Sequence, residues 1–144
     1  MIRYFIANNI EDYFDPAKYI VELMDHHTVF LLQGELGAGK TTLVNKIVEF
    51  IGTEDVVSSP TFALINPYLT KKGMVYHMDM YRIKQAEEAI DFGVEEYLWE
   101  GHYCFIEWPE RIETLIPDEY VKIEIDQKNH LSREIKVSVI DHNS

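Results

Sequence analysis

The chain has 144 residues, with 25 acidic and 13 basic side chains and a formal net charge of −12. A field of this sign repels the phosphate backbone of nucleic acids and argues against a protein that binds RNA or DNA tightly by itself. With 47% apolar residues, the length is sufficient for a buried α/β core, and we expect residues 1–144 to form a single domain.

No stretch has the composition of a membrane anchor or a secretory leader. The amino-terminal segment MIRYFIANNIEDYFD has acids where a signal peptide has an unbroken apolar core, and no run approaches the roughly 20 apolar residues that span a bilayer. Cys104 is the only cysteine, so it forms no internal disulfide, which suits a reducing compartment. We therefore expect a soluble cytoplasmic protein with no membrane partner.

The first half of the chain predicts strands and helices in alternation. Residues 2–6 are typical of a strand, and residues 16–25 open with a proline suited to a helix start. The run TVFLLQ, residues 28–33, is apolar without alternation, as in a strand buried on both faces. From Lys40, a helical spacing of apolar residues continues to Gly52, a residue type common where helices end; the apolar residues are Leu43, Ile47 and Phe50.

The second half predicts two antiparallel pairs and a helical region between them. The segments FALINPYL (62–69) and MVYHMDMY (74–81) flank Lys71, Lys72 and Gly73, which indicates a hairpin. Residues 85–99 look helical with a break near Gly93, residues 102–107 form a strand, and a short helix runs from Pro109 to about Leu115. The strictly alternating segments 120–126 and 132–140 fit a closing antiparallel pair.

Arg133 shares the parity of Ile135 and Val137, so strand geometry directs it to the face that these apolar residues use. An arginine there requires an anionic partner. The alternative is a frayed strand end, with the guanidinium in solvent.

The segment GELGAGKT, residues 34–41, matches the pattern GxxxxGK[ST] in full and lies between a predicted buried strand and a predicted helix. Lys40 supplies a mobile positive charge to terminal phosphates, and the Thr41 hydroxyl is placed to coordinate magnesium at the helix start. The small residues before them allow backbone N–H groups to turn toward phosphate oxygens, at Gly37, Ala38 and Gly39. The motif predicts a nucleotide site on an α/β P-loop NTPase fold, with a mixed sheet that has a parallel core, antiparallel carboxy-terminal strands and flanking helices.

Hydrolysis also needs acids near the magnesium, and two candidates end predicted strands. Asp79 follows VYHM and Glu107 follows YCFI, and ligands of open α/β sheets lie beyond the carboxyl ends of the parallel strands. The residues alone do not decide which acid is closer to the metal. In SSPTF, residues 58–62, Pro60 leaves the Thr61 hydroxyl on a rigid turn, a weaker signal.

Adenine is the favoured base. Guanine-selective G proteins carry an NKxD segment, whereas the only Asn-Lys pair here lies in NKIV, residues 45–48, inside the helix after the loop.

Taken in order, GELGAGKTTL, SPTF, YHMDMYR and IEWPER closely resemble the bacterial TsaE family, also called YjeE. These are small P-loop ATPases of tRNA threonylcarbamoyladenosine biosynthesis. The amino-terminal ANNIEDYFD lacks the Ser/Thr-rich helix start that the resemblance leads us to expect, so no nucleotide contact is assigned to residues 6–10.

The resemblance implies ATP and Mg²⁺ as ligands. Asp79 and Glu107 would be needed for hydrolysis and would act with Thr41 at the metal. The nucleotide would further contact Lys40, Thr42, Thr61 in a switch-like loop, Trp108 and Arg133. The resemblance also implies the partners TsaB and TsaD, with which the family forms threonylcarbamoyladenosine beside the anticodon of tRNAs that read codons starting with A. The tRNA would be held only indirectly, through these partners.

Two other functions share the phosphate loop. A small-molecule kinase normally clamps the transferred phosphoryl group with several arginines, and this chain has only Arg3, Arg82, Arg111 and Arg133. A nucleotide-dependent interaction module would bind without significant turnover. The expected function is a weak ATPase whose turnover depends on the partner complex.

Overall fold

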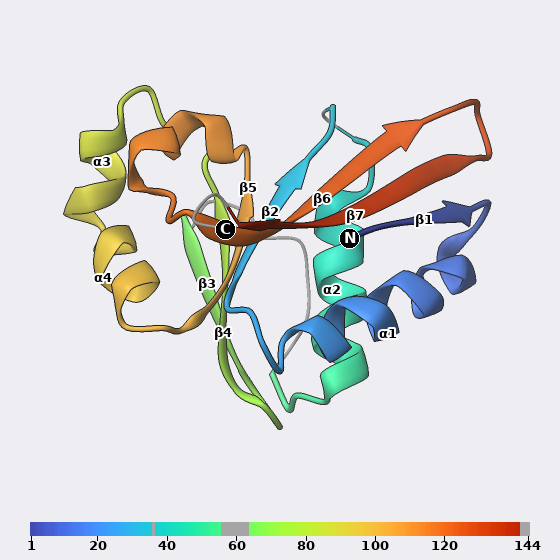
Figure 1. Cartoon of the computed structure of the whole chain (residues 1–144), viewed down its shortest axis with the longest axis horizontal. Coiled ribbons are helices and arrows are strands. Elements are labelled where there is room, and N and C mark those ends of the chain that lie inside the picture. The colour runs from blue at the N-terminus through green and yellow to red at the C-terminus, as the bar shows by residue number, and fades with distance from the viewer. Residues whose placement is uncertain (36, 56–63, 142–144) are drawn as a thin grey trace.

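The computed structural model describes residues 1–35, 37–55 and 64–141, in which seven strands form one mixed sheet (Figure 1). From edge to edge the strand order is β1-β7-β6-β2-β5-β4-β3. The strands are β1 Ile2–Ala7, β2 Val29–Gln33, β3 Ile65–Thr70, β4 Gly73–Asp79, β5 Tyr103–Glu107, β6 Glu119–Gln127 and β7 Arg133–Asp141.

The centre of the sheet is parallel and its edges are antiparallel. Strand β2 pairs in parallel with β5 and β6, and β4 pairs in parallel with β5. The hairpins β3–β4 and β6–β7 and the pair β1–β7 are antiparallel. This arrangement confirms the predicted fold class. It also brings the carboxyl ends of β2, β4 and β5 to one edge, where ligands of parallel sheets bind.

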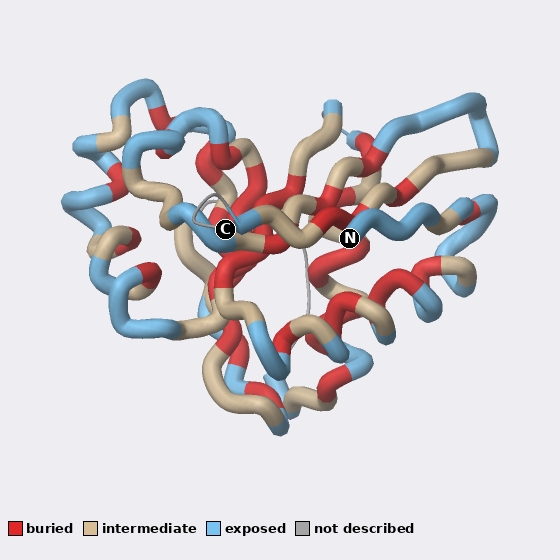
Figure 2. Tube along the Cα trace, in the orientation of Figure 1, coloured by how far each residue is buried: buried red, intermediate tan, exposed pale blue. Residues whose placement is uncertain are grey.

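Helices cover both faces of the sheet (Figure 1). On one face lie α1 Phe14–Leu23, which follows directly on the 3-10 helix η1 Ile10–Tyr13, and α2 Lys40–Ile51. On the other lie α3 Ala86–Asp91, α4 Val94–Trp99 and the 3-10 helix η2 Pro109–Leu115. The buried residues concentrate in the central strands between these layers (Figure 2).

Strand β2 is buried on both faces, as its unbroken apolar sequence predicts. Phe30 and Leu32 pack into the core beneath α1 and α2, whereas Val29 and Leu31 pack into the core beneath α3, α4 and η2. Full burial of each large apolar side chain contributes about 1.5–3 kcal/mol to stability. The strand that leads into the phosphate loop is therefore anchored from both sides.

Three expectations about helices need correction. The first helix begins at Phe14, before Pro16, because the first turn of a helix has no intrahelical acceptors for its N–H groups and so tolerates a proline. Phe50 is not a core residue: it is 38% exposed and lies edge-on against Phe14. The segment 109–115 is a 3-10 helix with non-helical backbone angles at Ile112.

The other elements match their predictions. Gly73 in the β3–β4 turn has φ 106° and Gly93 between α3 and α4 has φ 84°, left-handed values that favour glycine. In the closing hairpin, Val121 lies opposite Val139, and the alternating apolar residues face one core. Within the described ranges, no helix combines the length and apolar composition that a membrane crossing requires.

Candidate functional site

The loop between β2 and α2 leads directly into the start of a helix. Gly39 is the N-cap of α2 with φ 105° and ψ 17°, and no side chain in the described part of the chain caps the helix there. Gly37 is also left-handed, with φ 82°. The N–H of Ala38 is used inside the loop, where it donates to the Glu35 carbonyl at 3.0 Å. The N–H groups of the first turn of α2 have no intrahelical partners, and together with the helix dipole they form an anion site.

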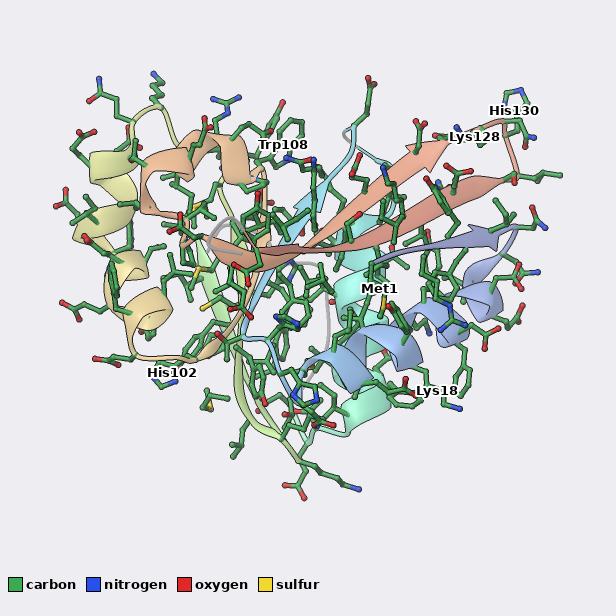
Figure 3. The ribbon with its side chains drawn as sticks, in the orientation of Figure 1. Met1, Lys18, His102, Trp108, Lys128 and His130 are labelled. Carbon is green, nitrogen blue, oxygen red and sulfur yellow. The ribbon has the colours of Figure 1, made fainter. Side chains whose placement is uncertain are left out.

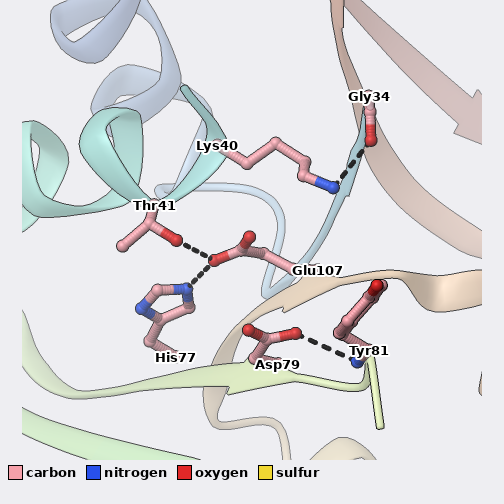
Figure 4. Close-up of polar contacts among 7 residues, drawn as sticks. All are labelled: Gly34, Lys40, Thr41, His77, Asp79, Tyr81 and Glu107. Carbon is pink, nitrogen blue, oxygen red and sulfur yellow. Dashed lines mark hydrogen bonds and ion pairs between the residues drawn. The ribbon is translucent and has the colours of Figure 1, made fainter. Parts of the chain in front are cut away.

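Lys40 lies folded back over this loop. Its Nζ donates to the Gly34 carbonyl at 2.7 Å (Figure 4). The same nitrogen lies 3.9 Å from the ring centroid of Trp108. The residue is only 4% exposed, and this burial lowers the pKa of Lys40, with the carboxylates of Glu107 and Asp79 opposing the shift. The ammonium is thus held by a carbonyl and an aromatic face, close to the site where an anion would bind.

Thr41, at the start of α2, contacts the acid at the end of β5. Its hydroxyl donates to Oε2 of Glu107 at 2.7 Å, and Nε2 of His77 lies 2.5 Å from the same oxygen (Figure 4). Glu107 is 3% exposed; burial raises its pKa, but the hydrogen bonds from His77 and Thr41 and the charge of Lys40 outweigh this effect, and the net shift is downward. Glu107 is therefore an anion at neutral pH.

Asp79 lies beside Glu107, because the two residues are paired in the register of β4 and β5. Its Oδ1 accepts a hydrogen bond from the Tyr81 N–H at 3.0 Å, which fixes the chain as it leaves β4. Both predicted acids thus reach the same edge of the sheet. Glu107, and not Asp79, makes the direct contact with Thr41.

Trp108 has left-handed backbone angles, φ 57° and ψ 52°, and it is the only non-glycine residue with positive φ among those described. Such a conformation is strained in a bulky residue and is concentrated at functional sites. Pro109 follows as the first residue of η2. The turn directs the indole toward Lys40 and Tyr81, with the Trp108 and Tyr81 ring centroids 5.0 Å apart. Figure 3 shows Trp108 at the end of the sheet where β2 enters the phosphate loop.

A cavity of about 200 Å³ lies on the other side of the phosphate loop. Arg133 lines this cavity and lies against Gly39. A Cβ added to that glycine would lie 3.6 Å from the Arg133 Cδ. Arg133 Nε is buried and has no hydrogen-bond partner among the described residues. Arg133 is paired with Ala7 and Gln127 as the first residue of β7, so it is not on a frayed strand end, and its half-buried side chain lies toward the cavity rather than wholly in solvent. The other lining residues are Ala7, Asn9, Ile10, Tyr13, Gly37, Gly39 and Thr42.

A larger hollow, of about 580 Å³, borders the loop near the β6–β7 hairpin. Its lining includes Glu35 and Asp126, whose carboxylates repel a polyphosphate. The smaller cavity, with an unpaired guanidinium nitrogen, is the better match for part of a nucleotide.

The predicted site residues fall into two groups around the loop. Lys40, Thr41, Asp79, Glu107 and Trp108 meet on one side, and Gly37, Gly39, Thr42 and Arg133 meet on the other. Ala38 lies in the loop itself and is buried. Thr61 lies outside the described residues.

Sequence reasoning missed the amino-terminal contribution to the cavity. Asn9 caps η1 through a reciprocal pair, in which its side chain accepts from the Asp12 N–H and the Asp12 carboxylate accepts from the Asn9 N–H. The pattern Asn-x-x-Asp is itself a helix-start signal, although it lacks serine or threonine. It carries Ile10 and Tyr13 against the phosphate loop. Sequence reasoning also missed the contact of His77 with Glu107, although His77 and Asp79 share a strand face.

The donor set near Thr41 suits a hard cation. Among the described residues no three His, Cys, Asp or Glu side chains are grouped as a complete metal cage. Magnesium typically takes one or two protein oxygens and completes its shell with phosphate and water. The Thr41 hydroxyl donates its proton to Glu107, so its oxygen lone pairs remain available to a cation.

Comparison with known proteins gives the family. A family model described as threonylcarbamoyl adenosine biosynthesis protein TsaE matches residues 7–135. The chain is 38% identical over 124 residues to the tRNA threonylcarbamoyladenosine biosynthesis protein TsaE of Bacillus subtilis, covering 86% of this chain and 77% of that protein. It is 36% identical over 121 residues to the protein of the same name from Rickettsia bellii, covering 83% of each.

The fold agrees with a solved relative. The crystal structure of Bacillus subtilis YdiB matches with a TM-score of 0.77 and 28% identity, covering 99% of this chain and 88% of that one. From the length of the family match, the identity to these relatives and the shared fold, the chain belongs to the TsaE family.

Proposed function

We propose that the chain is a weak, Mg²⁺-dependent ATPase that acts in the formation of threonylcarbamoyladenosine in tRNA. The observation that carries the proposal is the contact between Thr41 and Glu107, which joins the start of the phosphate-loop helix to the acid at the end of β5. The curated relatives named above carry this tRNA modification in their names.

The two sides of the loop suit the two ends of ATP. The phosphates bind at the uncapped start of α2, with Lys40 moving from the Gly34 carbonyl to the terminal phosphates. The nucleoside occupies the cavity of about 200 Å³, where Arg133 and Thr42 offer polar contacts and Ile10 and Tyr13 form an apolar wall.

Thr41 and Glu107 hold the metal end of the site, with Asp79 beside them. Bound magnesium neutralises the charge that develops on the transferred phosphoryl group and orders the water around it. Glu107 accepts from Thr41 and so fixes the threonine hydroxyl toward the phosphates. Glu107 and Asp79, as neighbouring carboxylates at the same sheet edge, orient the attacking water.

The positions of the described lysine and arginine side chains support slow turnover of the isolated chain. Lys40 lies close enough to the Thr41–Glu107 pair for its charge to act on Glu107. Arg111 is anchored to the Ile83 carbonyl at 3.1 Å, and Arg3 lies over the rings of Phe5 and Tyr19. We propose that TsaB and TsaD, which would also hold the tRNA, complete the site or rearrange it. A chain with net charge −12 suits a role in which the partners contact the tRNA.

The test is the rate of phosphate release from ATP and Mg²⁺, with and without TsaB and TsaD. The expected result is slow release by the chain alone, a higher rate with both partners, and background rates for Lys40→Ala. Lys46→Ala is the matched control, because Lys46 lies on the same helix and pairs with Glu49 at the surface. Fast release that the partners leave unchanged contradicts the regulatory part, and release that persists in Lys40→Ala contradicts the assignment of the site.

A further inference from the structure

His77 is a buried polar residue in the middle of the proposed site. It lies on β4, is 0% exposed, and contacts Oε2 of Glu107 through Nε2 (Figure 4). Its second ring nitrogen, Nδ1, is buried with no hydrogen-bond partner among the described residues. A buried polar atom without a partner destabilises a fold, so an apolar side chain would suit the core better. The contact with Glu107 is what the histidine adds.

The geometry of this contact is specific. Nε2 of His77 lies 2.5 Å from Oε2 of Glu107, and a carboxylate oxygen accepts hydrogen bonds, so Nε2 is placed to donate to it. Thr41 donates to the same oxygen, Oε2, which therefore accepts two hydrogen bonds. The other oxygen, Oε1, points away from His77 (Figure 4).

We propose that His77 is a positioning residue for Glu107: through its Nε2 contact it locks Oε2 onto Thr41 and leaves Oε1 directed to the magnesium–nucleotide side. This inference rests on the proposed function. His77 itself touches neither nucleotide nor metal, and it acts through the orientation of the carboxylate. Partners of this kind set the affinity of metal sites, and their loss typically weakens metal binding or activity by about 10- to 100-fold.

Three substitutions separate this role from simple packing. In His77→Gln the side-chain amide nitrogen reaches the place of Nε2 and retains the donor to Glu107. In His77→Asn the shorter amide reaches only the place of Nδ1, so the side chain remains polar but loses the donor. In His77→Leu the packing volume remains without any donor.

The measurement is the affinity for ADP by calorimetry, once with Mg²⁺ and once with EDTA, alongside phosphate release. His77→Gln is expected to retain the gain in affinity that Mg²⁺ confers on the wild-type chain. His77→Asn and His77→Leu are expected to lose about 10- to 100-fold of that gain, with the affinity in EDTA unchanged. The proposal is overturned if all three variants keep the full gain, or if affinity falls equally with and without Mg²⁺.

A second readout needs no variant. Two-dimensional ¹H–¹⁵N spectra of the imidazole rings are expected to show a proton on Nε2 of His77, and a ring without a proton on Nε2 overturns the proposal. If the wild-type chain itself shows no gain from Mg²⁺, the proposed function fails and this inference with it. If the wild type shows the gain and the variants do not differ from it, only the inference about His77 fails.

Discussion

Substitution of Gly39 by alanine tests the packing of the amino-terminal helix against the phosphate loop. A Cβ at Gly39 would overlap the Tyr13 hydroxyl oxygen, and Tyr13 is only 3% exposed, so the ring has little room to move. The backbone angle φ 105° adds strain for any residue with a side chain. We expect about 1–3 kcal/mol from the backbone and about 1–3 kcal/mol from the steric contact.

Gly37→Ala is the matched control for this substitution. Gly37 also has positive φ, 82°, but a Cβ added there would have no atom of the described residues within 4 Å, so we expect only the backbone contribution. Tyr13→Phe in the Gly39→Ala background removes the hydroxyl and leaves a ring carbon at 3.5 Å, an ordinary contact. We expect this second change to recover the steric contribution.

The assay is urea unfolding of the wild type, the single variants and the double variant. We expect Gly39→Ala to lose the most free energy of unfolding. The double variant and Gly37→Ala should each lose less, and by similar amounts. Equal losses in the two glycine variants, with no recovery from Tyr13→Phe, would refute the placement of Tyr13 against the loop. If Tyr13→Phe restores the free energy of unfolding of Gly39→Ala but not its affinity for ADP, the contact of Tyr13 with the loop affects folding only.

Three further predictions concern the pH dependence, fluorescence and thiol chemistry of the chain. Burial raises the pKa of Glu107, but its hydrogen bonds lower the pKa by more, so the net shift is downward. The ionised form therefore stabilises the fold above the ordinary unfolded pKa of about 4.3, and this contribution is lost as the pH falls through the lower folded pKa. Glu107→Gln should flatten the fall in unfolding free energy as the pH drops below about 5, and an unchanged slope contradicts the assignment. In a Trp99→Phe background, which removes an indole that is 80% exposed, the emission of Trp108 should change when ADP draws the loop lysine away from its ring; a response of the same size in Trp108→Phe contradicts this. Burial raises the pKa of Cys104 to about 12 and leaves the thiol 0% exposed, so a disulfide reagent such as DTNB should label it only after denaturation, and rapid labelling of the native chain contradicts its burial.

Local patterns predicted most of the fold because burial and sequence period agree. The unbroken run of β2 and the alternation of β6 and β7 each specify which faces are covered. Phe50 shows where this reasoning fails: its spacing fits the buried face of α2, but it lies near the helix end, where Phe14 covers only part of it. Helical spacing gives the direction of a side chain and says nothing of what packs over it.

The candidate site was predictable where chain order alone specifies geometry. Lys40 and Thr41 follow the loop, and Asp79 and Glu107 end neighbouring parallel strands, so strand polarity brings them to one edge. Which of the two acids contacts Thr41 depends on the reach of the threonine hydroxyl, which no spacing encodes. The contribution of Tyr13 required knowing that the first helix packs against α2, and that is a tertiary contact.

The most direct test of the central claim is a crystal structure of the chain with a non-hydrolysable ATP analogue and Mg²⁺. We predict the metal at the Thr41 hydroxyl with Glu107 beside it, Lys40 moved from the Gly34 carbonyl to the terminal phosphates, and the nucleoside in the cavity lined by Arg133. A metal distant from both Thr41 and Glu107, or a nucleoside bound away from Arg133, would contradict the proposed site.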